Sequence, residues 1–183
     1  YKDGENNPTD KDAKVDLNMD GFRFTTGDNI IVYPHGTLNI YNDTDSDRTD
    51  PEIIVSETII NNGTLNIDGF NITGSTNETV IDNHGSLHVA NGRVTSVNDA
   101  YAIINYNDAK SFTLNENAVI SLKDYTTNTN SVYNKSYDYT LTVDKGTIYG
   151  LLNDGKLVLE GTFAGKSIVG DGYGVTNQGG NLH

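Results

Sequence analysis

The chain has 183 residues, a formal net charge of −13, no Cys, no Trp, and 19 Gly against 3 Pro. A strongly acidic surface repels phosphate backbones and anionic lipid, which excludes nucleic acid as a partner, and no apolar run reaches the roughly 20 residues of a membrane-inserted helix. Without Cys there are no disulfides or thiolate metal sites, and the high content of Gly, Asn and Thr favours strands and turns over helices.

The N-terminal region differs from the rest of the chain. Residues 1–14 are polar, and an alternation of apolar and acidic or amide residues then predicts a half-buried strand around Val15, Leu17 and Met19. We interpret residues 1–29 as a lead-in and N-terminal cap, because the first repeat of a solenoid needs a polar lid. Residues 30–183 carry the repeats.

The repeats begin with an apolar residue two places before an Asn, at intervals of 19 to 29 residues. A first copy, Val32-x-Pro34, has Pro in place of Asn. The six full copies are Ile59-x-Asn61, Ile81-x-Asn83, Ile103-x-Asn105, Val132-x-Asn134, Leu151-x-Asn153 and Val175-x-Asn177.

A strand with two inward-facing apolar residues follows each turn, and in four of the six copies a third apolar residue comes seven places after the first of them. The pairs are Leu38/Ile40, Leu65/Ile67, Leu87/Val89, Phe112/Leu114, Leu141/Val143 and Leu157/Leu159. The third apolar residues are Ile72, Val94, Val119 and Ile148. One such coil cannot bury its own apolar residues, but stacked coils can, with equivalent positions about 4.8 Å apart.

The recurrent Asn predicts a hydrogen-bonded ladder. An amide carries both donors and acceptors, and Asn tolerates the left-handed conformation of tight turns. If the coils stack in register, Asn61, Asn83, Asn105, Asn134, Asn153 and Asn177 lie above one another.

Coils with an Asn ladder and units such as Asn61-x-Gly63-Thr64-Leu65-x-Ile67 resemble right-handed parallel β-helix proteins of the pectin-lyase-like superfamily. Within it they are most similar to adhesin-like surface proteins of microbes, and the resemblance covers residues 30–183. It implies an all-β, right-handed parallel β-helix of about six to seven coils on the N-terminal cap, in an extracellular or cell-surface location. This fold hosts lyases, hydrolases, tailspikes and adhesins, so function must be argued from the site residues.

The pattern reaches Leu182 just before His183, so the last coil is incomplete. An open solenoid end exposes strand edge and core. We therefore expect further coils downstream, or end-to-end contact with a partner.

Two sets of residues are candidates for ligand binding. Outward positions of the strand after each turn form a polar face that could hydrogen-bond sugar hydroxyls, or could be an ordinary hydrated face; its candidates are Asn66, His88, Thr113, Thr142 and Asp144. Tyr side chains concentrate after residue 100 and could stack on sugars or anchor a protein, or pack on the rim of the core; the candidates are Tyr106, Tyr133 and Tyr137.

Two acidic segments are candidate calcium sites, with solvated loops as the alternative. Asp16, Asn18 and Asp20 match the first half of an EF-hand loop, but its twelfth position is Gly27. Asp43, Asp45 and Asp47 form a second cluster without the terminal acid. No other cofactor is expected.

Catalysis is not favoured by the sequence. Asp144 and Glu160 fall at equivalent positions of successive coils and could form a carboxylate pair, as glycoside hydrolysis requires. The Asn-Thr-Asp, Asp-Asp and Gly-His-Gly motifs of β-helix polygalacturonases are nevertheless missing from the sequence. We expect a non-catalytic adhesin domain that binds a glycan or cell-surface protein of a host or neighbouring cell. A polysaccharide lyase or hydrolase and a structural stalk or filament segment are the alternatives.

Overall fold

The structure is a computed structural model, and it describes residues 12–42, 51–97, 100–115, 117–123, 130–137, 141–166, 175–177 and 181–182. For residues 141–145 and those from 157 onward, the description is limited to the backbone. The Asp43, Asp45 and Asp47 cluster lies outside the described residues.

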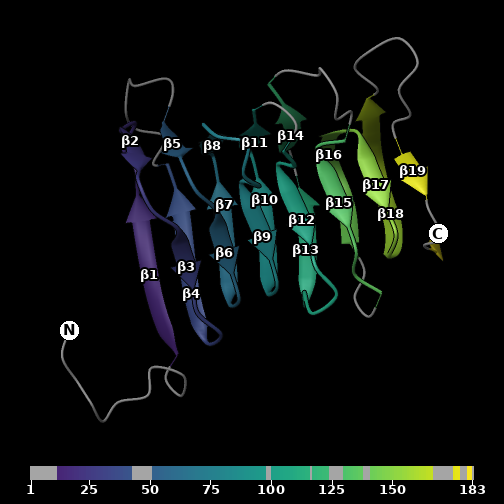
Figure 1. The fold of residues 1–183 in the computed structure, drawn as a ribbon, viewed down its shortest axis with the longest axis horizontal. Helices are drawn as coiled ribbons and strands as arrows, with labels where there is room; N and C mark the ends of the chain where they lie inside the picture. Colours follow the sequence, from purple (N-terminus) through teal and green to yellow (C-terminus); the bar gives the residue numbers. More distant parts are fainter. Residues whose placement is uncertain are drawn as a thin grey trace.

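The chain winds into a parallel β-solenoid of about five turns, and the described residues form no helix. Its strands lie across the long axis of a rod, with β1 at one end and β19 near the other (Figure 1). Each turn from β1 to β15 gives one strand to each of three faces.

The first face contains β1 (Ala13–Asn18), β4 (Gly36–Tyr41), β7 (Thr64–Asp68), β10 (Ser86–Ala90) and β13 (Ser111–Asn115). The second face contains β2 (Arg23–Thr26), β5 (Glu52–Val55), β8 (Asn71–Gly74), β11 (Arg93–Ser96) and β14 (Val119–Leu122). The third face contains β3 (Ile30–Val32), β6 (Ile59–Asn61), β9 (Ile81–Asn83), β12 (Ile103–Asn105), β15 (Val132–Asn134), β17 (Leu151–Asn153) and β19 (Val175–Asn177).

The first and second faces merge beyond β15. Strand β16 (Leu141–Tyr149) pairs with both β13 and β14, and β18 (Lys156–Lys166) follows it and pairs with β20 (Asn181–Leu182). This confirms the expected parallel β-solenoid. The solenoid has about five turns, fewer than the expected six to seven coils. Five turns, from β1 to β15, have three separate strands each, and beyond β15 one long strand replaces the first two.

Residues 12–29, which we expected in an N-terminal cap, contain two strands of the first turn. Strand β1 pairs with β4 from Ala13 to Asn18, and β2 pairs with β5 from Arg23 to Thr26. The alternation around Val15 and Leu17 is therefore a strand in register with the coils that follow.

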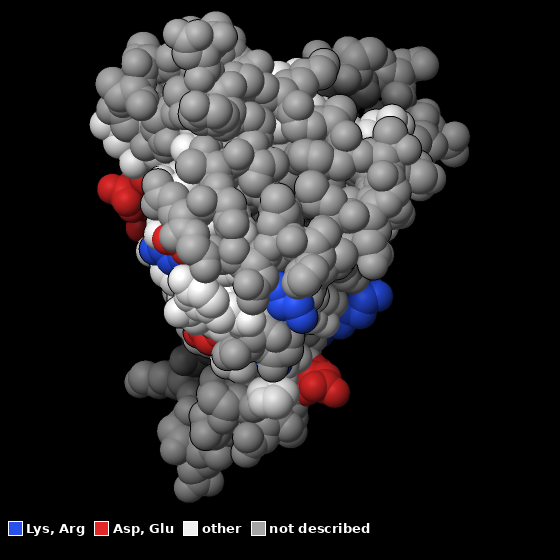
Figure 2. All heavy atoms as spheres, turned by 90° about the vertical axis from the view of Figure 1, so that its right-hand side faces the viewer, with Lys and Arg blue, Asp and Glu red and all other residues white. Residues whose placement is uncertain are grey.

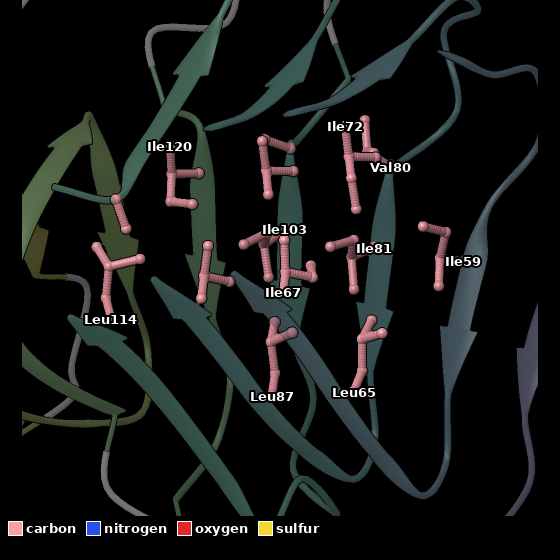
Figure 3. Packing of buried hydrophobic residues seen from close by; sticks show 14 of the residues in the cluster. Ile59, Leu65, Ile67, Ile72, Val80, Ile81, Leu87, Ile103, Leu114 and Ile120 are labelled. Carbon is pink, nitrogen blue, oxygen red and sulfur yellow. The ribbon is translucent and has the colours of Figure 1, made fainter. Parts of the chain in front are cut away.

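The core consists of rows of aliphatic side chains that run along the rod (Figure 3). Strand register places Leu65 against Leu87, and Ile59 against Ile81, and all four are at most 1% exposed. Each such side chain contributes about 1.5 to 3 kcal/mol by leaving water. The rows therefore bind neighbouring turns to each other, as the repeat pattern predicts.

One core position differs from the sequence prediction. Val94 pairs with Ile120, and Ile120 is fully buried, whereas Val119 points outward and is half-buried. The connection between β13 and β14 has one more residue than its counterpart between β10 and β11. A fixed spacing of seven residues therefore selected Val119 in place of Ile120.

The Asn ladder is present along the inner edge of the third face. Side-chain Nδ2 groups donate to the Oδ1 of the next Asn at 2.8, 2.7, 2.8 and 2.8 Å, in the order Asn61, Asn83, Asn105, Asn134 and Asn153. Four of these five residues are 0% exposed and Asn105 is 1% exposed. The backbone of Asn177 continues the register opposite Asn153.

The ladder ends at the first turn. Val32 pairs with Asn61, so Val32, rather than Pro34, holds the ladder position there. Asn61 Oδ1 is consequently buried with no hydrogen-bond partner in the described part of the chain.

Candidate functional site

Figure 2 looks at the C-terminal end of the rod, and the Lys, Arg, Asp and Glu side chains that it colours lie at the outer surface. Because the interior is filled by apolar rows and the Asn ladder, a ligand site must be built from outward positions of the faces. Two groups of such positions stand out, one on the first face and one on the third.

The first face presents polar side chains in rows across the turns. Asn66 pairs with His88, and His88 with Thr113, so three predicted binding residues lie on one row. The row continues to Asn39 and Asp16 on the N-terminal side, while Thr142 extends it at the level of the backbone. Alternation along each strand keeps these side chains outward, because their neighbours Leu65, Leu87 and Phe112 fill the core.

Side chains of this row bond to each other near its N-terminal end. Asn66 Nδ2 donates to Asn39 Oδ1 at 2.6 Å, and Asn39 Nδ2 donates to Asp16 Oδ1 at 2.5 Å. Lys14 Nζ lies 3.2 Å from Asp16 Oδ2. The hydrogen bond from Asn39, followed by the interaction with Lys14, lowers the pKa of Asp16 and keeps it ionised.

A groove of about 410 Å³ lies along the turn side of the same face. The hydroxyl groups of Thr37, Thr64 and Ser86, which are in register on β4, β7 and β10, line it together with Lys14 and Lys110. Hydroxyl groups and ammonium groups donate hydrogen bonds, and the hydroxyls also accept them. The groove therefore offers donors and acceptors of the kind that hydroxyl-bearing ligands use.

The third face carries a column of aromatic and charged residues, among which His84, Tyr106 and Lys135 directly follow a ladder Asn. The His84 and Tyr106 rings stack with centroids 4.3 Å apart, and His84 Nδ1 lies 2.7 Å from Asp108 Oδ1. Lys135 Nζ lies 4.9 Å from the centroid of Tyr106 and 4.6 Å from that of Tyr133. Lys135 thus contacts both Tyr106 and Tyr133, two of the Tyr residues that the sequence predicts to gather on one side of the solenoid.

Tyr133 also contacts its neighbours through its hydroxyl and its ring. The hydroxyl donates to Asp154 Oδ2, and the ring lies 5.4 Å from that of Tyr101. The bond to Asp154 is the main cause that raises the pKa of Tyr133 to about 12. Tyr137, the third predicted Tyr, is 58% exposed. The rings of Tyr106 and Tyr133 are thus in contact with other residues of the same chain, whereas Tyr137 extends into solvent.

The signal for this column was present in the sequence. His84, Tyr106, Lys135 and Asp154 each follow a ladder Asn, so the register that aligns the ladder aligns them too. The repeat pattern predicts rows at the positions two before each Asn and in the strands after each turn. It does not include Lys135, Asp108 or Lys110.

The predicted calcium ligands Asp16, Asn18 and Asp20 lie in and directly after the first strand. Asp16 and Asn18 lie in the extended strand β1, and Asn18 Oδ1 accepts a bond from the backbone N–H of Asp20. An extended strand does not wrap around an ion as a calcium loop does. In the part of the chain that the structure describes, no group of three or more His, Asp or Glu side chains could hold a metal ion.

The expected pair Asp144 and Glu160 falls at an irregularity of the β16–β18 pairing. Val143 pairs with Leu159 and the next pair joins Lys145 to Thr162, so the register shifts at this point. Asp144 and Glu160 are therefore not backbone partners.

No known protein family, curated protein or solved structure matches the chain. None of the described segments forms a helix of the length and apolarity that crossing a membrane requires.

Proposed function

We propose that this chain is a non-catalytic, extracellular domain of a surface adhesin that binds a glycan through the first face. The observation that carries the proposal is the groove of about 410 Å³ lined by in-register hydroxyls from β4, β7 and β10. Rigid strands hold the hydroxyls, and a bound sugar chain would not need to order a loop. The ligand runs along the rod, with one contact per turn about every 4.8 Å.

Two features support binding without turnover. Among the described residues, the groove is lined by Lys14, Lys110 and His35 and by one acidic residue, Asp12, so this part of the lining offers no carboxylate pair for glycoside hydrolysis. The polar row beside it, with Asn66 and His88, adds amide and imidazole groups on the same face. A polysaccharide-processing enzyme and a structural stalk are the competing functions.

A glycan array and a reducing-sugar assay on the same sample distinguish the three functions. Binding without released product supports the adhesin, product release supports the enzyme, and neither supports the stalk. For a glycan that binds, Thr64→Val removes a groove hydroxyl at nearly constant shape and should weaken binding about tenfold, since a good hydrogen bond contributes about 1 kcal/mol or slightly more.

The matched control is Thr25→Val, because Thr25 is exposed on β2 of the second face. Equal loss of binding in both variants would contradict the assignment of the groove. Labelling of intact cells with an antibody against the chain tests the surface location, and signal that requires cell lysis would contradict it.

A further inference from the structure

The central outward positions of the third face are mostly apolar, in contrast to the polar row of the first face. Each short strand of this face directs its central residue outward, away from the inward residues that flank it. From β3 to β17 these central residues are Ile31, Ile60, Asp82, Ile104, Tyr133 and Leu152, and we call them the outer strip.

The outer strip is not part of the core. Its members are separated from the interior by the β-sheet, and the core rows are filled by other residues such as Ile59, Ile81 and Ile103. Ile31 is 44% exposed, Ile60 and Leu152 are half-buried, as are the solvent-facing Asn66 and His88 of the first face, and Ile104 at the centre of the strip is 8% exposed. The strip is apolar except for Asp82 and the Tyr133 hydroxyl, and apolar patches rimmed by polar groups on the outside of a protein mark contact surfaces.

The pattern of the outer strip is self-complementary about Ile104. One turn before Ile104 the strip has Asp82, and one turn after it has Tyr133. Lys135 Nζ lies 4.6 Å from the centroid of the Tyr133 ring. Moving two turns gives Ile60 and Leu152. A two-fold axis through Ile104 therefore places Ile60 against Leu152 of a second copy, and Asp82 over Tyr133 beside Lys135 of that copy.

The burial of one carboxylate oxygen of Asp82 agrees with such a contact. Its Oδ1 is buried and has no hydrogen-bond partner among the described residues. An incoming ammonium group would provide a charge-assisted partner for this carboxylate. Such an ammonium group must come from a basic residue. The two-fold axis brings Lys135 of the second copy next to Asp82.

We propose that the outer strip is a dimer interface, in which two copies of this chain lie side by side with their rods antiparallel. Two-fold interfaces of this type are the commonest in soluble homo-oligomers, because one self-complementary patch closes the assembly. The net charge of −13 opposes association, and charges more than about 8 Å apart are screened at physiological ionic strength. We expect a weak dimer for this reason, and one that leaves the first face of both copies open to ligand.

Sedimentation of the full chain at protein concentrations from about 10 µM to about 1 mM tests the proposal. The wild-type chain should show a monomer–dimer equilibrium. D82K and K135D should each weaken the dimer by about tenfold or more, because each places like charges opposite one another. An equimolar mixture of the two variants should recover dimer, since a D82K copy and a K135D copy are again complementary.

Two control variants change the net charge equally at other sites. Asp68→Lys lies at the exposed end of β7, and Arg93→Asp is exposed on β11 of the second face. Both should keep the wild-type equilibrium. A wild-type chain that stays monomeric at about 1 mM, or a mixture of D82K and K135D without recovery, would overturn the proposal.

A cross-linking experiment keeps the test decisive if a charge variant does not fold. The chain has no Cys, so single cysteines can be placed freely. A short bifunctional thiol reagent should join Ile60→Cys to Leu152→Cys in a mixture of the two variants, and should join neither variant to itself. Thr25→Cys, on the second face, is the control that should give no product. Cross-linking of Ile60→Cys to itself, or none in the mixture, would overturn the proposed arrangement.

Discussion

Asn83 donates its side-chain Nδ2 to Asn105 Oδ1 at 2.7 Å and to the carbonyl oxygen of Ser111 at 3.1 Å. Its own Oδ1 accepts from Asn61 Nδ2 at 2.8 Å. One buried amide thus links three successive turns and also satisfies the backbone carbonyl of the first residue of β13. These groups are removed from water, and an unpaired buried polar group lowers the stability of the fold. Each hydrogen bond of the ladder therefore offsets the desolvation free energy of the groups that it joins.

Replacement of Asn83 by Ala should lower the free energy of unfolding by about 1 to 3 kcal/mol. The substitution leaves the Asn61 amide and the Asn105 oxygen without one partner each, and it opens a small cavity. Urea denaturation followed by circular dichroism measures the change. Asn66→Ala on the outward side of β7 is the control, for which a change within about 0.5 kcal/mol is expected. Equal stability of Asn83→Ala and the wild-type chain would contradict a structural role for the ladder.

Val32→Asn should extend the ladder by one turn. Val32 is 5% exposed and holds the position opposite Asn61, whose Oδ1 has no partner in the described region. An Asn amide there can donate to this oxygen, whereas an Asp of nearly the same shape cannot when ionised. At neutral pH we expect Val32→Asn to be more stable than Val32→Asp by at least about 2 kcal/mol, measured by urea denaturation. Equal stabilities of the two variants would show that residue 32 does not form a hydrogen bond with Asn61 Oδ1.

The ladder was predictable from sequence because a solenoid converts sequence spacing directly into vertical register. Asn61, Asn83 and Asn105 follow one another at a constant place in each turn, so loops of different length do not disturb them. The same reasoning failed at Val119, where one additional residue before β14 moved the core position to Ile120. The number of residues in a turn depends on the local backbone geometry, and the spacing of apolar residues in the sequence does not predict it.

The contacts between side chains on the outer surface could not be predicted in this way. Register alone puts Tyr106 beside His84 and Lys135, but ring stacking and the position of Lys135 Nζ depend on side-chain rotamers. The groove beside Lys110 depends equally on the path of the turns. The sequence thus predicts which residues share a row, and the structure is needed to decide which of them form a site.

Gly85→Ala should be strongly destabilising. A Cβ at Gly85 would lie 2.1 Å from the carbonyl oxygen of Gly63, so the close stacking of two successive turns leaves no room for it. Because the obstacle is backbone, the turns must separate, and we expect a loss of about 3 kcal/mol in thermal or urea unfolding. Gly27→Ala is the matched control, since nothing lies within 4 Å of a Cβ there. A Gly85→Ala chain as stable as Gly27→Ala would show that the turns are less closely stacked than described.

Asp82→Asn should stabilise the chain at neutral pH and have no such effect in acid. Burial raises the pKa of Asp82 above the ordinary value of 3.8, and the nearby His84 and Lys135 offset only part of this rise. A carboxyl group with a raised pKa in the folded state favours folding only while it is protonated. Its contribution is complete below pH 3.8 and is lost as the pH rises through the folded-state pKa.

The neutral amide of Asp82→Asn avoids this loss, so the difference in unfolding free energy between the variant and the wild-type chain should grow from near zero in acid to a plateau at neutral pH. Urea denaturation at a series of pH values, with protein dilute enough to remain monomeric, measures the difference. Asp68→Asn removes the same charge from the exposed end of β7 and corrects for the change in net charge. A pH-independent difference would mean that Lys135 compensates the Asp82 carboxylate fully within one chain, which would also remove the need for a second copy to supply its partner.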